Sequence, residues 1–291
     1  MNVRIAPRLD IKGPNLVKGI HFEGLRVLGK PEDFARYYYE NGADELIYMD
    51  AVASLYGRNS LLEIIERTSR EIFIPLTVGG GLRTIEDIRK VLRAGADKVS
   101  LNTAAIARPE FVHEASRTFG ASTIVVSIEA MPVANGRYEA YVNYGRDRTS
   151  VDALEWAVQA ADLGAGEIMI TSIAREGTGQ GFDVELVRKV SDQVSVPVIA
   201  GGGAGSVDDV RRVITEGRVE AVALASILHY NYLKQAQQVA GGDYATEGNT
   251  EFLKRGTGFS RVKDASPRDV KSHLAANSIA CRYSEDAGTH V

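Results

Sequence analysis

Two carboxylates in this 291-residue chain could supply acid–base chemistry, Asp10 and Glu129. Each ends a short β-branched run, VRIAPRLD for the first and TIVVSIE for the second, so each is expected at the end of a strand. Two acids that face one another across a pocket can divide general-acid and general-base work, because their surroundings can keep one protonated and leave the other ionised. The alternative is that each is a solvated strand-end carboxylate or a helix-capping partner.

Two glycine triplets, residues 79–81 and 201–203, could bind phosphate groups. Each follows a strand-like run and precedes a helix-like one, where the lack of a Cβ lets backbone N–H groups approach a phosphate. Residues after the next strands could complete each site. The first glycine site then comprises Gly80, Gly81, Asn102 and Thr103, and the second comprises Gly202, Gly203, Ala225 and Ser226. A tight turn is the alternative for each triplet. Neither matches the patterns of ATP or dinucleotide sites, so no nucleotide cofactor is expected.

Three further charged residues are candidates on the same face. Asp50 ends the second strand-like run, Glu176 lies in the loop after the sixth, and Lys18 lies in a glycine-containing loop after the first. Lys18 could fold over a bound anion, or it could be an exposed lysine on a mobile loop.

Four charged residues lie at the opposite ends of the strand-like runs. They are Arg4, Glu45, Lys98 and Glu167. Two positive and two negative side chains could close a ring of salt bridges across the floor of a barrel. Such a ring could serve stability alone, or it could gate a passage into the barrel.

The elements that must position these residues alternate along the chain. The expected strands are residues 3–9, 45–50, 74–78, 97–102, 123–129, 167–172, 196–200 and 220–226, and the expected helices are 31–42, 61–69, 84–95, 109–120, 151–164, 183–192, 206–217 and 266–277. Eight strands alternating with helices predict an α/β fold that closes as a (β/α)8 (TIM) barrel.

An internal repeat supports a barrel made of two half-barrels. An offset of 122 residues places IPLTVGGGLRTIEDIRKVLRAG, which begins at Ile74, on VPVIAGGGAGSVDDVRRVITEG, which begins at Val196. The same offset places GADELIYM on GAGEIMIT. A two-fold pseudosymmetric barrel offers two equivalent anion sites on one face. A ligand phosphorylated at both ends would fit it.

Composition excludes several other classes of protein. The formal charge of −4 leaves no basic excess for nucleic acid. One cysteine, Cys281, forbids an internal disulfide, and the five histidines never fall at a metal-ligand spacing, so no metal is expected. The N-terminal residues contain no long apolar stretch, so we expect a cytoplasmic protein without membrane contact. A barrel can accommodate residues 1–291 as one domain.

Several longer motifs resemble those of a known family. They are RLDIKGPNLVKGIHFEGLR, GADELIYMD, IPLTVGGG, GADKVSLNTAA, GAGEIMITSIAREGTGQGFD, VPVIAGGGAG and ALASILHY, within residues 3–230. The chain thereby resembles the HisF family, the cyclase subunits of imidazole glycerol-phosphate synthase. The segment KGIHFEGLR separates it from the sister isomerases of the HisA family.

The resemblance implies a barrel that receives ammonia from a glutaminase, HisH, docked on its N-terminal face as a heterodimer. Ammonia would pass Arg4, Glu45, Lys98 and Glu167 and enter the barrel. At the other face it would react with a bisphosphorylated ribulosyl formimino carboxamide ribotide. The products would be imidazole glycerol phosphate and aminoimidazole carboxamide ribotide, in histidine biosynthesis. Asp10 matches one of the family's two catalytic aspartates, and Thr171 and Gly177 fall in matching motifs and join the expected substrate-binding residues.

The chain departs from the family pattern around the expected reaction centre. Glu129 stands where the family has the second aspartate, and Arg8 where it usually has cysteine. Ala174 and Glu176 replace the aspartates of an Asp-Arg-Asp-Gly-Thr motif, and Gly201 replaces a serine. A carboxylate moved by one methylene can change a rate about a hundredfold.

Residues 231–265 form an expected inserted loop between the last strand and the last helix. Because it follows a strand, it should emerge on the catalytic face, as a lid or as a disordered insertion. Residues 282–291 are expected to be a disordered tail.

Three functions fit these observations. The first is the histidine-pathway cyclase. The second is a HisF-like paralogue that uses ammonia from a HisH-like glutaminase for amidino modification of a surface sugar, which the changed residues favour. The third is an inactive glutaminase-binding ammonia conduit, against which two phosphate sites argue.

Overall fold

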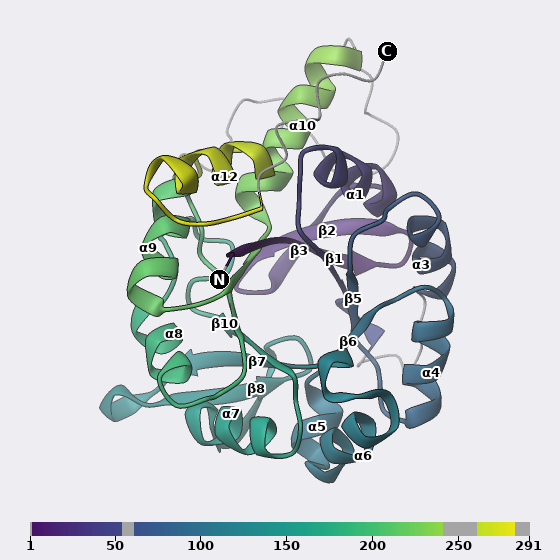
Figure 1. Cartoon of the computed structure of the whole chain (residues 1–291), viewed down its shortest axis with the longest axis vertical. Coiled ribbons are helices and arrows are strands. Elements are labelled where there is room, and N and C mark those ends of the chain that lie inside the picture. Colours follow the sequence, from purple (N-terminus) through teal and green to yellow (C-terminus); the bar gives the residue numbers. More distant parts are fainter. Residues whose placement is uncertain (1, 54–60, 241–260, 283–291) are drawn as a thin grey trace.

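Eight parallel strands close into a barrel in the computed structural model, which describes residues 2–53, 61–240 and 261–282 (Figure 1). In the order of their pairing the strands are β1 (Arg4–Lys12), β4 (Leu46–Asp50), β5 (Leu76–Gly79), β6 (Lys98–Leu101), β7 (Ile124–Pro132), β10 (Glu167–Ser172), β11 (Val198–Gly201) and β12 (Ala221–Leu224). The last strand pairs back onto the first, with Arg4 opposite Ala221. The closure confirms the predicted (β/α)8 barrel.

Helices cover the outside of the barrel (Figure 1). The predicted ones are present as α1 (Pro31–Glu40), α3 (Leu62–Ser69), α4 (Ile85–Arg93), α6 (Glu110–Phe119), α7 (Ala153–Asp162), α8 (Val184–Ser191), α9 (Val207–Gly217) and α12 (Pro267–Ala276). Short α5 (Thr103–Ala107) and long α10 (Ser226–Ala240) add to them, with 3-10 turns at Ala121–Thr123 and Ala134–Gly136. Helix α4 begins where the sequence places its cap, because the Thr84 hydroxyl accepts from the Asp87 N–H at 3.1 Å.

Side chains alternate along each strand between the interior of the barrel and the layer between the barrel and the helices, so the protein has two hydrophobic cores. On β1, Ile5, Leu9 and Ile11 pack outward against the helices. Ala6 faces inward with side chains from other strands, including Ile47 and Met169. Because successive side chains point to opposite faces, Arg4, Arg8 and Asp10 share the inward face with Ala6.

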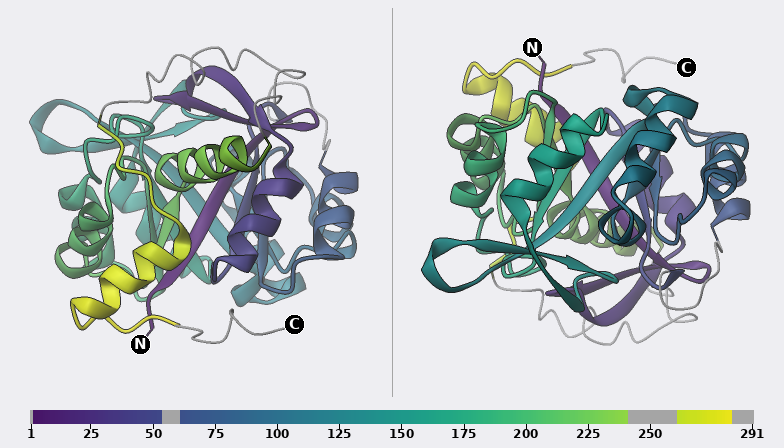
Figure 2. Two further views of the ribbon diagram at one scale, coloured as in Figure 1. Left: turned by 90° about the horizontal axis from the view of Figure 1, so that it is seen from above. Right: turned by 90° about the horizontal axis from the view of Figure 1, so that it is seen from below.

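Two β-hairpins interrupt the alternation of strands and helices, and the sequence analysis did not predict them. The first consists of β2 (Asn15–Ile20) and β3 (Glu23–Gly29) after β1, and the second of β8 (Tyr138–Val142) and β9 (Asp147–Asp152) after β7. They lie on the face opposite the N-terminus (Figure 2). Their tips meet through the rings of Phe22 and Tyr144, whose centroids are 4.5 Å apart.

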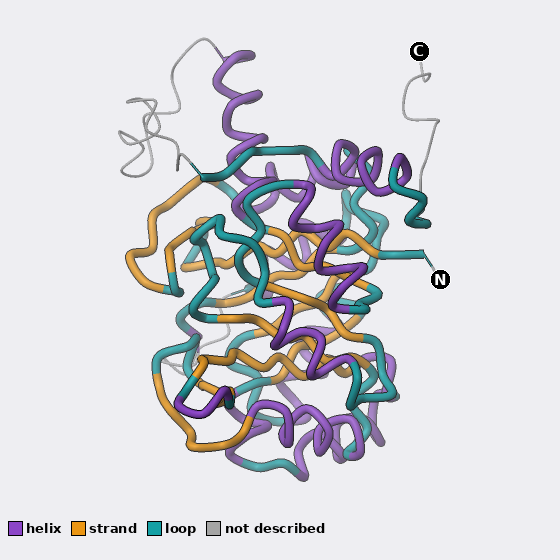
Figure 3. The backbone as a smooth tube through the Cα atoms, turned by 90° about the vertical axis from the view of Figure 1, so that its left-hand side faces the viewer, coloured by secondary structure: helices purple, strands orange, loops and turns teal. Residues whose placement is uncertain are grey.

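The predicted loop at 231–265 begins instead as helix. Residues 231–240 continue α10, which extends past the body of the barrel (Figure 3). Residues 241–260, on which the predicted lid falls, lie outside the described part of the chain, as do residues 283–291 of the predicted tail. Further along, the Ala265 N–H donates to the Ile227 carbonyl at 3.1 Å and ties the chain back to the barrel.

Candidate active site

Arg8 and Asp10 form a buried ion pair at the carboxyl end of β1. Arg8 Nε donates to Asp10 Oδ1 at 3.0 Å, and Arg8 Nη1 donates to Thr171 Oγ1 at 3.3 Å. The guanidinium carbon lies 5.2 Å from the centre of the Phe22 ring. Among the described residues the buried Nη2 atom has no hydrogen-bond partner. Burial opposes the charge on Arg8, but the carboxylates of Asp10 and Glu176 hold its pKa above the usual value.

Glu129 faces the same space from β7. Its Oε2 accepts from Asn102 Nδ2 at 3.1 Å, and its side chain is buried. Burial raises the pKa of Glu129 to about 7, against the opposing effects of Arg8 and the Gly145 N–H. A carboxyl with this pKa carries its proton at mildly acidic pH and can donate it near neutrality.

Lys18 and Glu176 form a second buried ion pair. Lys18 comes from the first hairpin, and Glu176 from the loop after β10. The structure thus holds Lys18 in the interior and not on an exposed loop. Its charge is engaged by a carboxylate before any ligand enters.

Asp50 has a local role in its loop. Its Oδ1 accepts from the N–H groups of Val52 at 3.0 Å and Ala53 at 2.8 Å. The residue also lines the cavity beside the first glycine site. These contacts fix the loop after β4, so Asp50 shapes the cavity wall.

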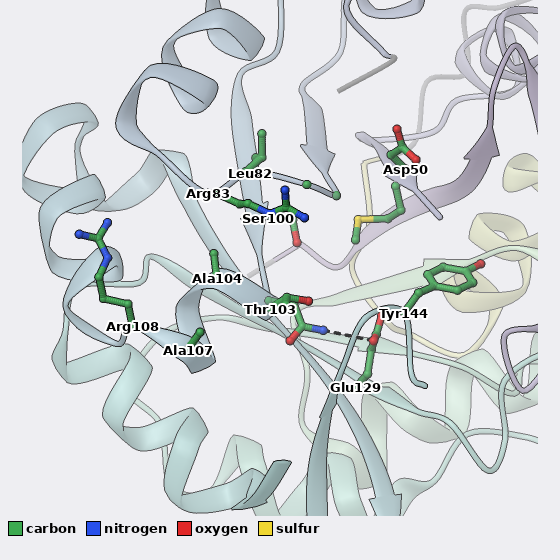
Figure 4. Close-up of a pocket in the computed structure, with 14 residues that line it drawn as sticks. Asp50, Leu82, Arg83, Ser100, Thr103, Ala104, Ala107, Arg108, Glu129 and Tyr144 are labelled. Atoms are coloured by element: carbon green, nitrogen blue, oxygen red, sulfur yellow. Dashed lines mark hydrogen bonds between the residues drawn. The ribbon is translucent and has the colours of Figure 1, made fainter. Parts of the chain in front are cut away.

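The first glycine site opens onto a cavity of about 330 Å³. Gly80, Gly81, Asn102 and Thr103 line it, and Glu129 and Tyr144 lie together on its wall (Figure 4). Gly80 has φ +99°, and a Cβ there would lie 2.6 Å from the Asp50 carbonyl oxygen, so the turn itself requires glycine. The cavity thus joins the first glycine site to one of the two candidate acids.

The second glycine site has much less space before it. Gly177, Gly202, Gly203, Ala225 and Ser226 surround a hollow of about 10 Å³ together with Arg8 and Glu176. Gly202 has φ +86°, and a Cβ there would lie 2.8 Å from the Ser172 carbonyl oxygen. The two glycine turns are therefore equivalent in backbone, and they differ in the space before them.

Arg4, Glu45, Lys98 and Glu167 form a closed ring at the other end of the barrel, the gate ring. Its four ion pairs measure 3.1 Å for Arg4–Glu45, 2.9 Å for Arg4–Glu167, 3.2 Å for Lys98–Glu45 and 3.0 Å for Lys98–Glu167. Each charge has two partners of opposite sign, so the ring needs no other ion to be neutral.

Sequence reasoning missed the aromatic cover of the site. Phe22 and Tyr144 close over Arg8 from the two hairpin tips, and burial followed by the nearby Asp10 carboxylate raises the pKa of Tyr144 well above its usual value. Tyr144 is therefore a neutral hydroxyl beside Asp10. Arg83 and Arg108, also missed, line the first cavity. The half-barrel repeat carried no signal for Phe22, Tyr144 and Arg108, because they lie outside the repeated blocks. Arg83 lies within the first block, but the second block has Gly205 at the matching position.

In the part of the chain that the structure describes, no three side chains of His, Cys, Asp or Glu are grouped to hold a metal ion. Burial, followed by the charge on Lys18, lowers the pKa of His229 to about 3, and its Nδ1 contacts the Tyr38 hydroxyl at 2.5 Å. His229 is thus a neutral core histidine.

Fold and site together define a (β/α)8 protein with a half-barrel repeat, two glycine turns, buried acids near the carboxyl ends of the strands and a ring of charges at their amino ends. A family model described as "Histidine biosynthesis protein" matches residues 4–234. "Imidazole glycerol phosphate synthase subunit HisF" of Legionella pneumophila is 55% identical over 208 residues, which are 72% of this chain and 98% of the relative. The protein of the same name from Alkaliphilus metalliredigens is 46% identical over 228 residues, 78% of this chain and 90% of that one. The chain belongs to the histidine biosynthesis protein family, and within it to the HisF subunits of imidazole glycerol phosphate synthase.

Proposed function

We propose that this protein is the ammonia-dependent cyclase of imidazole glycerol-phosphate synthase. Its substrate would be the bisphosphorylated ribulosyl formimino carboxamide ribotide, and its products imidazole glycerol phosphate and aminoimidazole carboxamide ribotide. The observation that carries the proposal is that Glu129 lines the cavity of the first glycine site, while Arg8, the buried ion-pair partner of Asp10, lines the hollow of the second. The phosphates of the substrate would bind at the two turns and hold its reacting centre between the acids.

Asp10 and Glu129 would divide the proton transfers. Ammonia must lose protons as it replaces the ketone oxygen, the oxygen must gain two protons to leave as water, and the nitrogen of the expelled ribotide must be protonated to leave as an amine. Glu129, with a pKa of about 7, suits the donor role near neutral pH. Asp10, paired with Arg8, suits the acceptor role. Asn102 positions Glu129 through the hydrogen bond at 3.1 Å.

The gate ring would admit ammonia from a glutaminase partner. Its side chains lie at the amino ends of the strands, opposite the site. Near this face Phe73, between α3 and β5, is 76% exposed, while Thr68 and Ile74 line the adjoining hollow. An exposed aromatic beside a hollow is typical of a protein interface. We infer that a HisH-like subunit docks there to form a heterodimer.

A cytoplasmic location fits this biosynthetic role. No helix in the described residues is both long and apolar enough to cross a bilayer.

Turnover with free ammonium tests the proposal without the partner. Purified protein, the bisphosphorylated substrate and saturating ammonium should give turnover followed by ultraviolet absorbance. Asp10→Asn should abolish it. Tight substrate binding without turnover would contradict the proposal.

The small space at the second glycine site favours one other function. A hollow of about 10 Å³, against about 330 Å³ at the first site, suits a ligand with one phosphate better than a ligand with two. A HisF-like paralogue that channels ammonia for amidino modification of a surface sugar would fit this asymmetry. Such a protein would pass ammonia to an acceptor and would not consume the bisphosphorylated substrate.

A further inference from the structure

We propose that Arg8 binds substrate, donating from Nη2 to an oxygen of a phosphoryl group at the second glycine site. The inference rests on the proposed function for its substrate class, a ligand phosphorylated at both ends. Arg8 would thus have a binding role at a position where the HisF family usually has cysteine.

The hydrogen bonds of Arg8 leave one nitrogen of the guanidinium available. Nε is used by Asp10 and Nη1 by Thr171, at 3.0 and 3.3 Å. Nη2 is buried and has no partner among the residues that the structure describes. A buried N–H without an acceptor is unfavourable, so an oxygen beside Nη2 would be stabilising. The two fixed bonds and the Phe22 ring hold the guanidinium in place for it.

The hollow that Arg8 lines has the surroundings of an oxyanion site. Arg8 lines it together with Gly202, Gly203 and Ser226. Ser226 begins α10, and the first N–H groups of a helix have no acceptor within the helix. At about 10 Å³ the hollow has room for one oxygen atom. One phosphoryl oxygen would enter it, while the others would lie over the glycine turn.

Arg8 is the residue that can supply donors to an anion at this position. Lys18 is already paired with Glu176. Arg8 therefore supplies the spare donors near a phosphoryl group that would otherwise face the carboxylates of Asp10 and Glu176. A guanidinium that two bonds hold in place can direct its third nitrogen at a phosphoryl oxygen, which cysteine and lysine cannot reproduce.

Binding of inorganic phosphate, measured by calorimetry at constant ionic strength, tests the proposal. The wild-type protein should bind two phosphates. Arg8→Met should weaken one of them more than tenfold, and Arg8→Lys should weaken the same one by a smaller factor. Ser226→Ala should affect the site that Arg8→Met affects. Gly81→Ala, the control at the first glycine site, should affect the other.

Arginine side-chain NMR of the wild-type protein provides a second readout that needs no variant. The Arg8 Nη resonances should shift on addition of phosphate. Unshifted resonances, a single bound phosphate in the wild-type protein, or folded Arg8 variants that keep both affinities within twofold would each overturn the proposal. Neither measurement depends on turnover. A protein that binds two phosphates through Arg8 but forms no imidazole product would retain this inference and refute the proposed function.

Discussion

Replacing Glu129 with glutamine should change how stability depends on pH. Burial holds the pKa of Glu129 at about 7 in the folded state, against 4.5 as the ordinary value. The folded state therefore keeps a proton that the unfolded state loses above about pH 4.5. The contribution of protonated Glu129 to the free energy of unfolding is fully present below about pH 4.5 and is lost as the pH rises through about 7. Glu129→Gln removes the titration but keeps the shape of the side chain.

The size of the effect follows from the two pKa values. The pKa rises from 4.5 to about 7, and each unit corresponds to about 1.4 kcal/mol. Above about pH 7, ionisation of the buried Glu129 therefore lowers the free energy of unfolding by roughly 3 kcal/mol. At about pH 5.5 the reduction is roughly 1 kcal/mol. The stability of Glu129→Gln relative to the wild-type protein should thus increase by roughly 2 kcal/mol between about pH 5.5 and about pH 8.5.

Urea unfolding followed by circular dichroism can measure this difference. At each pH the free energy of unfolding of one protein is subtracted from that of the other, which cancels the contribution of groups that titrate alike in both. Glu139→Gln is the matched control, because hydrogen bonds from Arg148 hold the pKa of Glu139 below its usual value and keep it ionised over the whole range. The difference in free energy of unfolding between Glu139→Gln and the wild-type protein should be independent of pH. A Glu129→Gln difference equally independent of pH would refute the reasoning and, with it, the donor role of Glu129.

Three other substitutions test separate parts of the account. Asp10→Asn should lower ammonium-dependent turnover at least about a hundredfold. It should also lower the free energy of unfolding by roughly 3 kcal/mol, because buried Arg8 loses its counter-charge. Unchanged turnover would remove Asp10 from the chemistry. Phe73→Ala should weaken binding of the glutaminase about tenfold or more with little effect on stability. The control Glu155→Ala, on the side of the barrel, should leave binding unchanged. Equal affinities of the two variants in surface plasmon resonance would place the interface elsewhere. Lys98→Met should leave ammonium-dependent turnover within about twofold and raise the glutamine consumed per product; unaltered coupling would make the ring purely structural.

The barrel could be predicted because its determinants are local. Each strand is a short β-branched run, and helices such as α4 carry their caps in sequence, with Thr84 and Asp87 in a capping box. The hairpins were missed for an equally local reason. Their tips place His21 and Phe22, or Asn143 and Tyr144, at positive φ, where the usual signal is Asn-Gly or Asp-Gly.

The candidate site could be predicted only in part. Strand ends placed Asp10 and Glu129 at one mouth, because parallel strands end on the same face of a barrel. The inequality of the two glycine sites could not be predicted from their matching sequences. Arg8 and Glu176, which come from other segments of the chain, line the small hollow before the second turn. Such an effect depends on packing between distant segments.

The most direct test of the central claim is the fate of nitrogen from ¹⁵N-labelled ammonium. The protein should be incubated with the bisphosphorylated substrate and labelled ammonium, and the products examined by NMR and mass spectrometry. We expect one ¹⁵N atom in the imidazole ring of imidazole glycerol phosphate and none in the released aminoimidazole carboxamide ribotide. Substrate that binds but is recovered intact and unlabelled would contradict the account.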